Sequence, residues 1–148
     1  MNTGMEMFSA KHYNLVMVTK LGEDGERVAA RFLERKGYEI IKRNERLLPF
    51  GEIDIVARSP HGVTVFVEVK TMVRAESGLQ PEDQLSPAKI RKMVSAAQAF
   101  ITKHPATVEE RAGWRIDAVT VQVPSAGPLT NTTEDVIIRH YENLPSRI

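Results

Sequence analysis

The sequence contains no cysteine and no long apolar run. The absence of cysteine excludes a disulfide framework, a thiol nucleophile and a cysteine zinc site, and it favours a reducing compartment. No apolar run approaches the roughly 18 residues that a membrane helix requires, and the N-terminal residues lack the apolar stretch of a secretory signal. We therefore expect a cytoplasmic protein with no membrane association.

Net charge is also nearly absent, because 20 Lys and Arg residues balance 19 Asp and Glu residues. Bulk charge thus does not predict a nucleic-acid binder, and any basic surface must be local. With 148 residues, 42% of them hydrophobic, the chain is long enough for one compact domain and too short for two. Residues 1–19 show no sustained period, so we expect a disordered N-terminal tail before a single domain over residues 20–148.

Hydrophobic periodicity predicts two helices. Residues 20–37 place an apolar stripe on one side, and Gly37 stands where a left-handed C-terminal cap is expected. Residues 86–105 begin with Ser86, which suits an N-cap, and Pro87, which suits the first helical position, and their apolar residues repeat at helical spacing. These two segments are expected to flank a sheet.

The remaining regular segments have the character of β-strands. The expected strands are a short one in residues 38–44, two at about 52–58 and 63–70, a central one at 114–123 that contains Asp117, and a last one at 134–143, with a loop at 45–51. Asp117 is either a buried, hydrogen-bonded acid or an edge residue. The order α-β-β-β-α-β-β predicts an α/β fold with a mixed central sheet flanked by helices.

Charged residues interrupt two of these apolar strands. If the hairpin folds symmetrically about His61, Asp54 lies across from Glu68, and Glu52 lies across from Lys70. Directly opposed like charges are destabilising, so the two acids call for a cation between them. Oxygen ligands without a nearby cysteine favour Mg²⁺ or Mn²⁺ over zinc. The alternative is a solvated face with a cross-strand salt bridge from Glu52 to Lys70, and spacing alone supports both interpretations equally.

The acids belong to a recognisable motif, which begins at Asp54 and continues as "EVK" at residues 68–70. This pattern resembles the signature of the PD-(D/E)XK nuclease superfamily. Together with "GEDGERVAARFLERKGYEIIKRNER", "GEIDIVA", "VFVEVKT" and the later helix with Lys89, it resembles the YraN-like group of predicted endonucleases from about residue 21 to 123. The first 19 residues lie outside the likeness, and Ile53 stands where the superfamily's name has proline. The resemblance implies a restriction-endonuclease-like core.

The resemblance also implies a metal-dependent endonuclease with assigned residues. Asp54, Glu68 and the backbone carbonyl of Val69 would bind Mg²⁺ or Mn²⁺, which polarises the scissile phosphate and activates water. Lys70 would lie beside that water; because neighbouring carboxylates favour its charged form, we expect it to stabilise developing negative charge rather than act as the base. Glu26 would be the fourth catalytic residue, completing the metal or water shell, with an ordinary exposed first-turn acid as the alternative.

Local basic residues are expected to contact the substrate. Arg43 and Lys89 match the family pattern, and Lys42, Arg46 and Lys92 are further candidates. No base-reading module is recognisable, so we expect structure-selective or nonspecific cleavage of DNA, with RNA as the alternative substrate. The likeness to archaeal junction-resolving enzymes of the superfamily points to branched DNA and a homodimer. The alternative function is a noncatalytic nucleic-acid-binding or scaffold protein that retains the fold.

Overall fold

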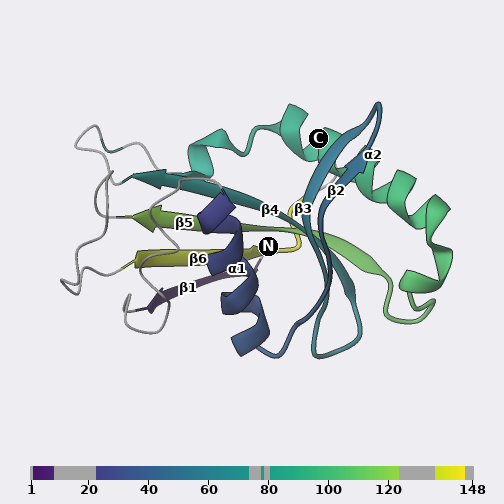
Figure 1. The fold of residues 1–148 in the computed structure, drawn as a ribbon, viewed down its shortest axis with the longest axis horizontal. Helices are drawn as coiled ribbons and strands as arrows, with labels where there is room; N and C mark the ends of the chain where they lie inside the picture. The colour runs from purple at the N-terminus through teal and green to yellow at the C-terminus, as the bar shows by residue number, and fades with distance from the viewer. Residues whose placement is uncertain (1, 9–22, 74–77, 79–80, 124–135, 146–148) are drawn as a thin grey trace.

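The computed structural model describes residues 2–8, 23–73, 78, 81–123 and 136–145. Within these residues six strands form one sheet, in the order β1-β6-β5-β4-β3-β2 (Figure 1). The strands are β1 (Asn2–Phe8), β2 (Glu39–Leu47), β3 (Gly51–Arg58), β4 (Thr64–Val73), β5 (Trp114–Val123) and β6 (Val136–Glu142). The helices are α1 (Glu23–Arg35) and α2 (Pro87–Lys103), with short 3-10 turns η3 (Pro81–Gln84) and η4 (Pro105–Thr107).

The sheet is mixed, as the sequence predicted. The inner strands β4 and β5 run parallel, and every other neighbouring pair is antiparallel. A parallel pair requires a long crossover, and the segment with α2 supplies it. The predicted α/β class and restriction-endonuclease-like arrangement are therefore confirmed.

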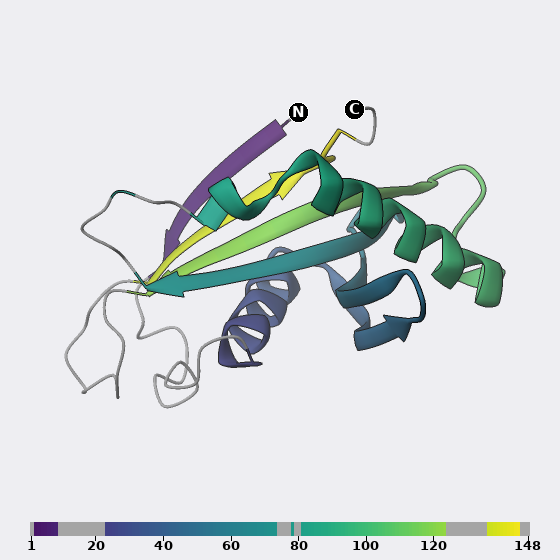
Figure 2. The same ribbon diagram turned by 90° about the horizontal axis from the view of Figure 1, so that it is seen from above.

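The two helices cover opposite faces of the sheet (Figure 2). Alternation along β4 divides the interior into two cores, because Val67 packs with Phe32 of α1 on one face and Phe66 packs with Phe100 of α2 on the other. The Phe66 and Phe100 rings meet edge to face with centroids 5.6 Å apart. Odd-numbered residues of β4 thus face α1, and even-numbered residues face α2.

α2 begins and α1 ends at the residues that the sequence predicts as caps. The Ser86 hydroxyl accepts a hydrogen bond from the Lys89 backbone N–H at 3.2 Å, and Pro87 occupies the first turn of α2. After α1, Gly37 has a φ of +88°, which is the left-handed conformation expected of a C-terminal cap. Neither helix of the described ranges has the length and apolar character of a membrane span.

Two segments differ from the expectation. Residues 45–47, predicted as loop, extend β2 and pair with residues 51–53 of β3. Residues 2–8, predicted as part of a disordered tail, form β1 and pair with residues 136–142 of β6. Strand β1 forms by pairing with β6, which is distant in the chain, and its own residues show no local periodicity. The sequence therefore did not predict β1. The rest of the predicted tail, residues 9–19, lies outside the described residues.

Candidate metal and catalytic site

The site lies where β3 and β4 part. Their ladder runs from Arg58 paired with Thr64 to Ile55 paired with Val67, which confirms the register expected from symmetry about His61. The next residues in line are Asp54 and Glu68, and there the pairing stops.

At this point the Asp54 side chain, instead of the β3 backbone, accepts a backbone hydrogen bond from β4. Its Oδ2 accepts a hydrogen bond from the Val69 N–H at 2.8 Å, in place of a further ladder bond. The two acids therefore sit at a fork between separating strands.

The backbone of Val69 faces the same fork. Thr64 donates its N–H to Gly113, just before β5, so even-numbered residues of β4 direct their backbone groups toward β5 and odd-numbered residues direct theirs toward β3. The Val69 N–H meets Asp54, and its carbonyl points to the same side of the strand. Two carboxylates and one carbonyl are thereby available at the point where β3 and β4 diverge.

Burial and charge make the acid pair electrostatically strained. Glu68 is only 5% exposed. Burial of Asp54 and, after it, the charge of Glu68 raise the pKa of Asp54 to about 7, although the hydrogen bond from the Val69 N–H acts to lower this pKa. Two ammonium groups partly balance these acids: Lys89 Nζ lies 3.1 Å and Lys70 Nζ lies 3.4 Å from the same oxygen, Glu68 Oε1. Lys89, predicted from sequence to contact nucleic acid, thus approaches the acid itself from α2.

Glu26 reaches the same region from α1. It is partly buried, and burial raises its pKa, an effect that Arg43 opposes and that the charges of Glu52 and Glu68 reinforce. These influences place Glu26 near the acid pair rather than on an isolated, solvated part of the helix. The structure therefore brings Glu26, Glu68 and Arg43 into one electrostatic neighbourhood.

Sequence reasoning missed Asn44. The ladder pairs Arg43 with Ile55 and Glu45 with Ile53, so Asn44 stands opposite Asp54. Its φ of 52° is left-handed, a conformation that few residues other than glycine and asparagine adopt readily. Its side chain also hydrogen bonds Glu26, which lowers the pKa of that acid. The signal in the sequence was a lone asparagine among charged residues, which is equally typical of a surface turn.

The remaining predicted residues lie around this centre. Lys42 pairs with Glu45 at 3.7 Å, and Arg46 stands opposite Glu52 in the β2–β3 ladder, so Glu52 faces Arg46 rather than Lys70. The side chains of Lys42, Arg43, Arg46 and Lys92 are exposed, with Lys92 on α2.

The donor set fits a hard divalent cation. Within the described residues no group of three or more His, Cys, Asp or Glu side chains converges as metal ligands. A metal at the fork would therefore depend on Asp54, Glu68, the Val69 carbonyl and water. Oxygen-only donors and few protein ligands are typical of Mg²⁺ and Mn²⁺ sites.

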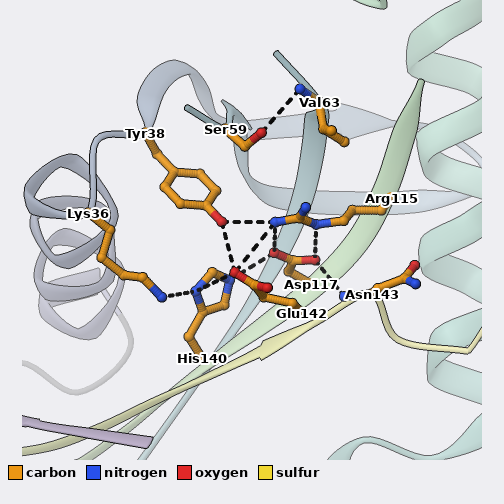
Figure 3. A network of polar contacts seen from close by, with 9 residues as sticks. All are labelled: Lys36, Tyr38, Ser59, Val63, Arg115, Asp117, His140, Glu142 and Asn143. Atoms are coloured by element: carbon orange, nitrogen blue, oxygen red, sulfur yellow. Dashed lines mark hydrogen bonds and ion pairs between the residues drawn. The ribbon is translucent and has the colours of Figure 1, made fainter. Parts of the chain in front are cut away.

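A second polar cluster lies on the α1 side of the sheet (Figure 3). Asp117 is fully buried there and accepts hydrogen bonds from Arg115 Nε at 2.9 Å, His140 Nε2 at 2.8 Å and the Asn143 N–H at 2.9 Å. Burial alone would raise the pKa of Asp117, but these hydrogen bonds lower it. Because Lys36 Nζ can only donate, its 2.9 Å contact makes His140 Nδ1 the acceptor and leaves the proton on Nε2.

Tyr38 and Glu142 complete this cluster. Arg115 donates to the Tyr38 hydroxyl at 2.8 Å, and that hydroxyl donates to Glu142 at 3.1 Å, while burial raises the pKa of Tyr38 to about 12. Asp117 faces the same side as Val67, its ladder partner, so it lies on the face opposite Glu68. It is the buried, hydrogen-bonded acid that the sequence allowed, on an inner strand and not at an edge.

Comparisons with known proteins identify the family of this chain. Residues 25–121 match the model of the "Uncharacterised protein family UPF0102". The chain belongs to this family. A UPF0102 protein of Roseiflexus castenholzii is 43% identical over 105 residues, covering 71% of this chain and 81% of its own. A UPF0102 protein of Geobacter sulfurreducens is 37% identical over 129 residues, covering 87% and 94%. The UPF0102 match includes both acids at the fork.

One solved structure also overlaps the UPF0102 fold. The structure of Pyrococcus furiosus SfsA in complex with Ca²⁺ covers 82% of this chain and 62% of that chain, with 18% identity and a TM-score of 0.34.

Proposed function

We propose that this UPF0102 protein is a divalent-metal-dependent endonuclease that hydrolyses phosphodiester bonds in DNA. The observation that supports the proposal most is the fork between β3 and β4, which holds Asp54, Glu68 and the Val69 carbonyl beside one another. Family membership and the α/β fold support a nuclease-like enzyme at the coarser level. The assignment of roles rests on the positions of the individual side chains.

The acid pair would hold the cation. Mg²⁺ or Mn²⁺ bound by Asp54, Glu68 and the Val69 carbonyl would polarise the scissile phosphate and make bound water a better nucleophile near neutral pH. Without a cation the pair favours a proton, because burial and Glu68 raise the pKa of Asp54 to about 7. The residues themselves therefore favour positive charge at this position.

Lys70 and Glu26 would act on the reacting groups. The Lys70 ammonium lies 3.4 Å from Glu68 Oε1 and a quarter of its side chain surface is exposed, so it can reach a phosphate at the fork and stabilise developing negative charge. Glu26 approaches from α1, with Asn44 hydrogen bonded to it, and would accept a hydrogen bond from water in the site.

Basic side chains on two elements would bind the DNA backbone. Exposed Arg43 and Arg46 lie on β2, and exposed Lys92 lies on α2 one turn from Lys89. Contacts of this kind release counterions from DNA, so binding should weaken steeply as salt rises. The sequence contains no recognisable base-reading module, which favours recognition of DNA structure over sequence.

The test is a cleavage assay with linear, flapped and four-way DNA and with single-stranded RNA, in Mg²⁺, in Mn²⁺ and in EDTA. We expect cleavage of DNA only with metal, and a loss of at least about a hundredfold in Glu68→Gln and Lys70→Ala, since even groups that only support metal ligands cost about 10–100-fold. Arg31→Ala, an exposed change on α1, is the matched control and should cleave like the wild type. Equal cleavage by wild type and both site variants would reveal a contaminant and contradict the proposal.

A noncatalytic DNA-binding protein is the second candidate. One observation favours it: Lys89 Nζ lies 3.1 Å from Glu68 Oε1, so an ammonium group already pairs with the oxygen that would bind a metal ion. DNA binding without cleavage in either metal would support this alternative. The homodimer expected from the sequence stays a prediction, which light scattering of the purified protein tests.

A further inference from the structure

The tip of the β2–β3 hairpin exposes apolar surface. Among the large hydrophobic side chains of the described residues, the exposed ones are Leu48, at 80%, and Phe50, at 46%. They flank Pro49, which is also exposed, so three apolar residues in a row face outward at one turn. Single exposed apolar residues are common, but a continuous group at a projecting tip is typical of a contact surface.

The tip continues into hollows on α2. One hollow of about 410 Å³ is lined by Pro49, Phe50, Ala88, Arg91, Lys92 and Ser95. A second, of about 460 Å³, is lined by Phe50, Ser95, Gln98, Ala99, Thr102 and Lys103. Phe50 belongs to both, so its ring stands between an apolar tip and a helix surface.

The charge of this surface indicates a polyanion. The linings contain Arg91, Lys92 and Lys103 and no acid, and the sequence has no Asp or Glu from residue 84 to residue 108. Apolar side chains beside cations suit DNA, which has both phosphates and base faces. An acidic protein could pair with these cations, but such pairing would not require the exposed apolar side chains at the tip.

The hairpin also connects the tip to the fork. Phe50 precedes Asp54 by four residues, and β3 is extended over most of this interval, which spans about 13 Å at about 3.3 Å per residue. Along the axis of a duplex each strand rises about 3.4 Å per nucleotide, so this span corresponds to about four nucleotides of a duplex that lies along β3. A DNA molecule in contact with the tip would thus place a phosphodiester bond about four nucleotides away near the acid pair.

We propose that Leu48 and Phe50 form a wedge that stacks on bases at an interruption of duplex DNA, such as a gap or a branch point, while Arg91 and Lys92 bind the flanking phosphates. The inference rests on the proposed function, because it specifies the substrate of the same site. Opening an intact base step costs free energy, whereas an interrupted step is already unstacked. The wedge therefore selects interrupted DNA.

The test compares binding of gapped and continuous duplexes of equal length at fixed salt in EDTA, where no cleavage occurs. We expect the wild type to prefer the gapped duplex, and the double variant Leu48→Ser/Phe50→Ser to bind it about tenfold more weakly, the order expected for loss of one base–aromatic stack. Phe50→Trp should keep the preference, since it retains a stacking ring. The Leu48 side chain is 80% exposed, so Leu48→Ser alone should not disturb folding. A smaller loss of affinity in this single variant would therefore come from a lost contact with DNA.

Charge variants give an independent control. Arg91→Ala/Lys92→Ala should weaken binding to both duplexes and reduce the dependence of log affinity on log salt by about two. Arg31 is an exposed residue of α1, and α1 covers the face of the sheet opposite α2 (Figure 2), so Arg31→Ala should leave the preference for the gapped duplex unchanged. With metal present, wild-type cuts should lie about three to five nucleotides from the gap, as the span of about four nucleotides predicts.

The outcomes separate the two proposals. An unchanged preference in Leu48→Ser/Phe50→Ser, alongside metal-dependent cleavage, would overturn the wedge and leave the endonuclease standing. Wedge-dependent binding without cleavage in any metal would support the wedge and contradict the endonuclease. A wild-type dimer that the double variant converts to a monomer would show that the tip joins two copies of the chain, and it would also overturn the wedge.

Discussion

Asp54 is the residue whose protonation should show in the stability of the metal-free protein. Its pKa rises from 3.8 to about 7 because of burial and then of Glu68. Between these values the folded state binds a proton that the unfolded state releases, so the free energy of unfolding falls as pH rises from about 4 to about 7. We expect the protein in EDTA to be more stable at pH 5.5 than at pH 7.5 by at least about 1 kcal/mol, since one pKa unit corresponds to about 1.4 kcal/mol.

Urea unfolding of Asp54→Asn isolates this effect. The amide does not titrate, so the difference between the two pH values should shrink, although Glu26, whose pKa is raised as well, keeps part of it. The lowered pKa of Asp117 acts only below its ordinary value of 3.8 and stays outside this range. A variant with the full wild-type pH dependence would show that Asp54 is not the titrating group.

Asn44 combines a backbone conformation with a hydrogen bond, and two substitutions separate them. Asn44→Ala should lower the free energy of unfolding by about 1 kcal/mol more than Asn44→Gly, because alanine resists the left-handed conformation that glycine adopts freely. Both variants lose the hydrogen bond to Glu26, so their cleavage rates should fall by similar factors. Equal stability of the two variants would contradict the conformational part, and an unchanged rate would contradict the contact with Glu26.

At the scale of elements, the position of α1 depends on a close approach at Gly25. A Cβ at this position would overlap Thr71 at the end of β4. Gly25→Ala should therefore cost about 1–3 kcal/mol of stability, the usual range for an overpacked core, and should move the neighbouring Glu26 away from the fork. Thermal or urea unfolding and cleavage rates measure both effects.

Thr71→Ala provides the matched rescue. It removes Oγ1 and Cγ2, two of the three atoms that the new Cβ would meet, so the double variant Gly25→Ala/Thr71→Ala should regain part of the lost stability. If the two changes were simply additive, the proposed close approach would be wrong.

Element prediction succeeded where the signal was local. α2 carries its own cap, proline and apolar stripe, and β5 has apolar residues on both of its faces, so both matched with little error. β2 was cut short because Pro49 and Gly51 suggested a loop, while pairing with β3 extended it to Leu47. Strand β1 owes its existence to β6, more than 100 residues away, and no property of its own residues revealed it.

On the scale of the whole molecule, the buried cluster around Asp117 joins β5, β6 and the turn that follows α1. Removing one partner of a buried ion pair typically costs about 3–5 kcal/mol, so Asp117→Asn should be strongly destabilised in urea unfolding. Its charges balance, with Lys36 and Arg115 against Asp117 and Glu142, which supports a stabilising role. Glu110→Gln, at an exposed acid, should unfold like the wild type.

Metal affinity of Asp117→Asn separates this cluster from the fork. Asp117 faces α1 whereas Glu68 faces α2, so Mn²⁺ should bind the folded variant within about twofold of the wild type. A large loss of affinity would mean that the two clusters are coupled.

The sequence predicted the part of the candidate site that lies within the single hairpin of β3 and β4. Asp54 and Glu68 follow from strand alternation about His61, and Glu26 and Lys89 entered through resemblance to a known family. Asn44, the His140 contacts and the exposed tip depend on how separate elements meet, and short-range patterns do not record that.

The most direct test of the central claim is a crystal grown with Mn²⁺ and measured at a wavelength where manganese scatters anomalously. The account predicts an anomalous peak at the fork, within about 2.0–2.4 Å of carboxylate oxygens from Asp54 and Glu68 and of the Val69 carbonyl, the range of hard-cation contacts. The peak should vanish in Glu68→Gln. A well-diffracting crystal with no peak between these residues, or with manganese bound only elsewhere, would contradict the account.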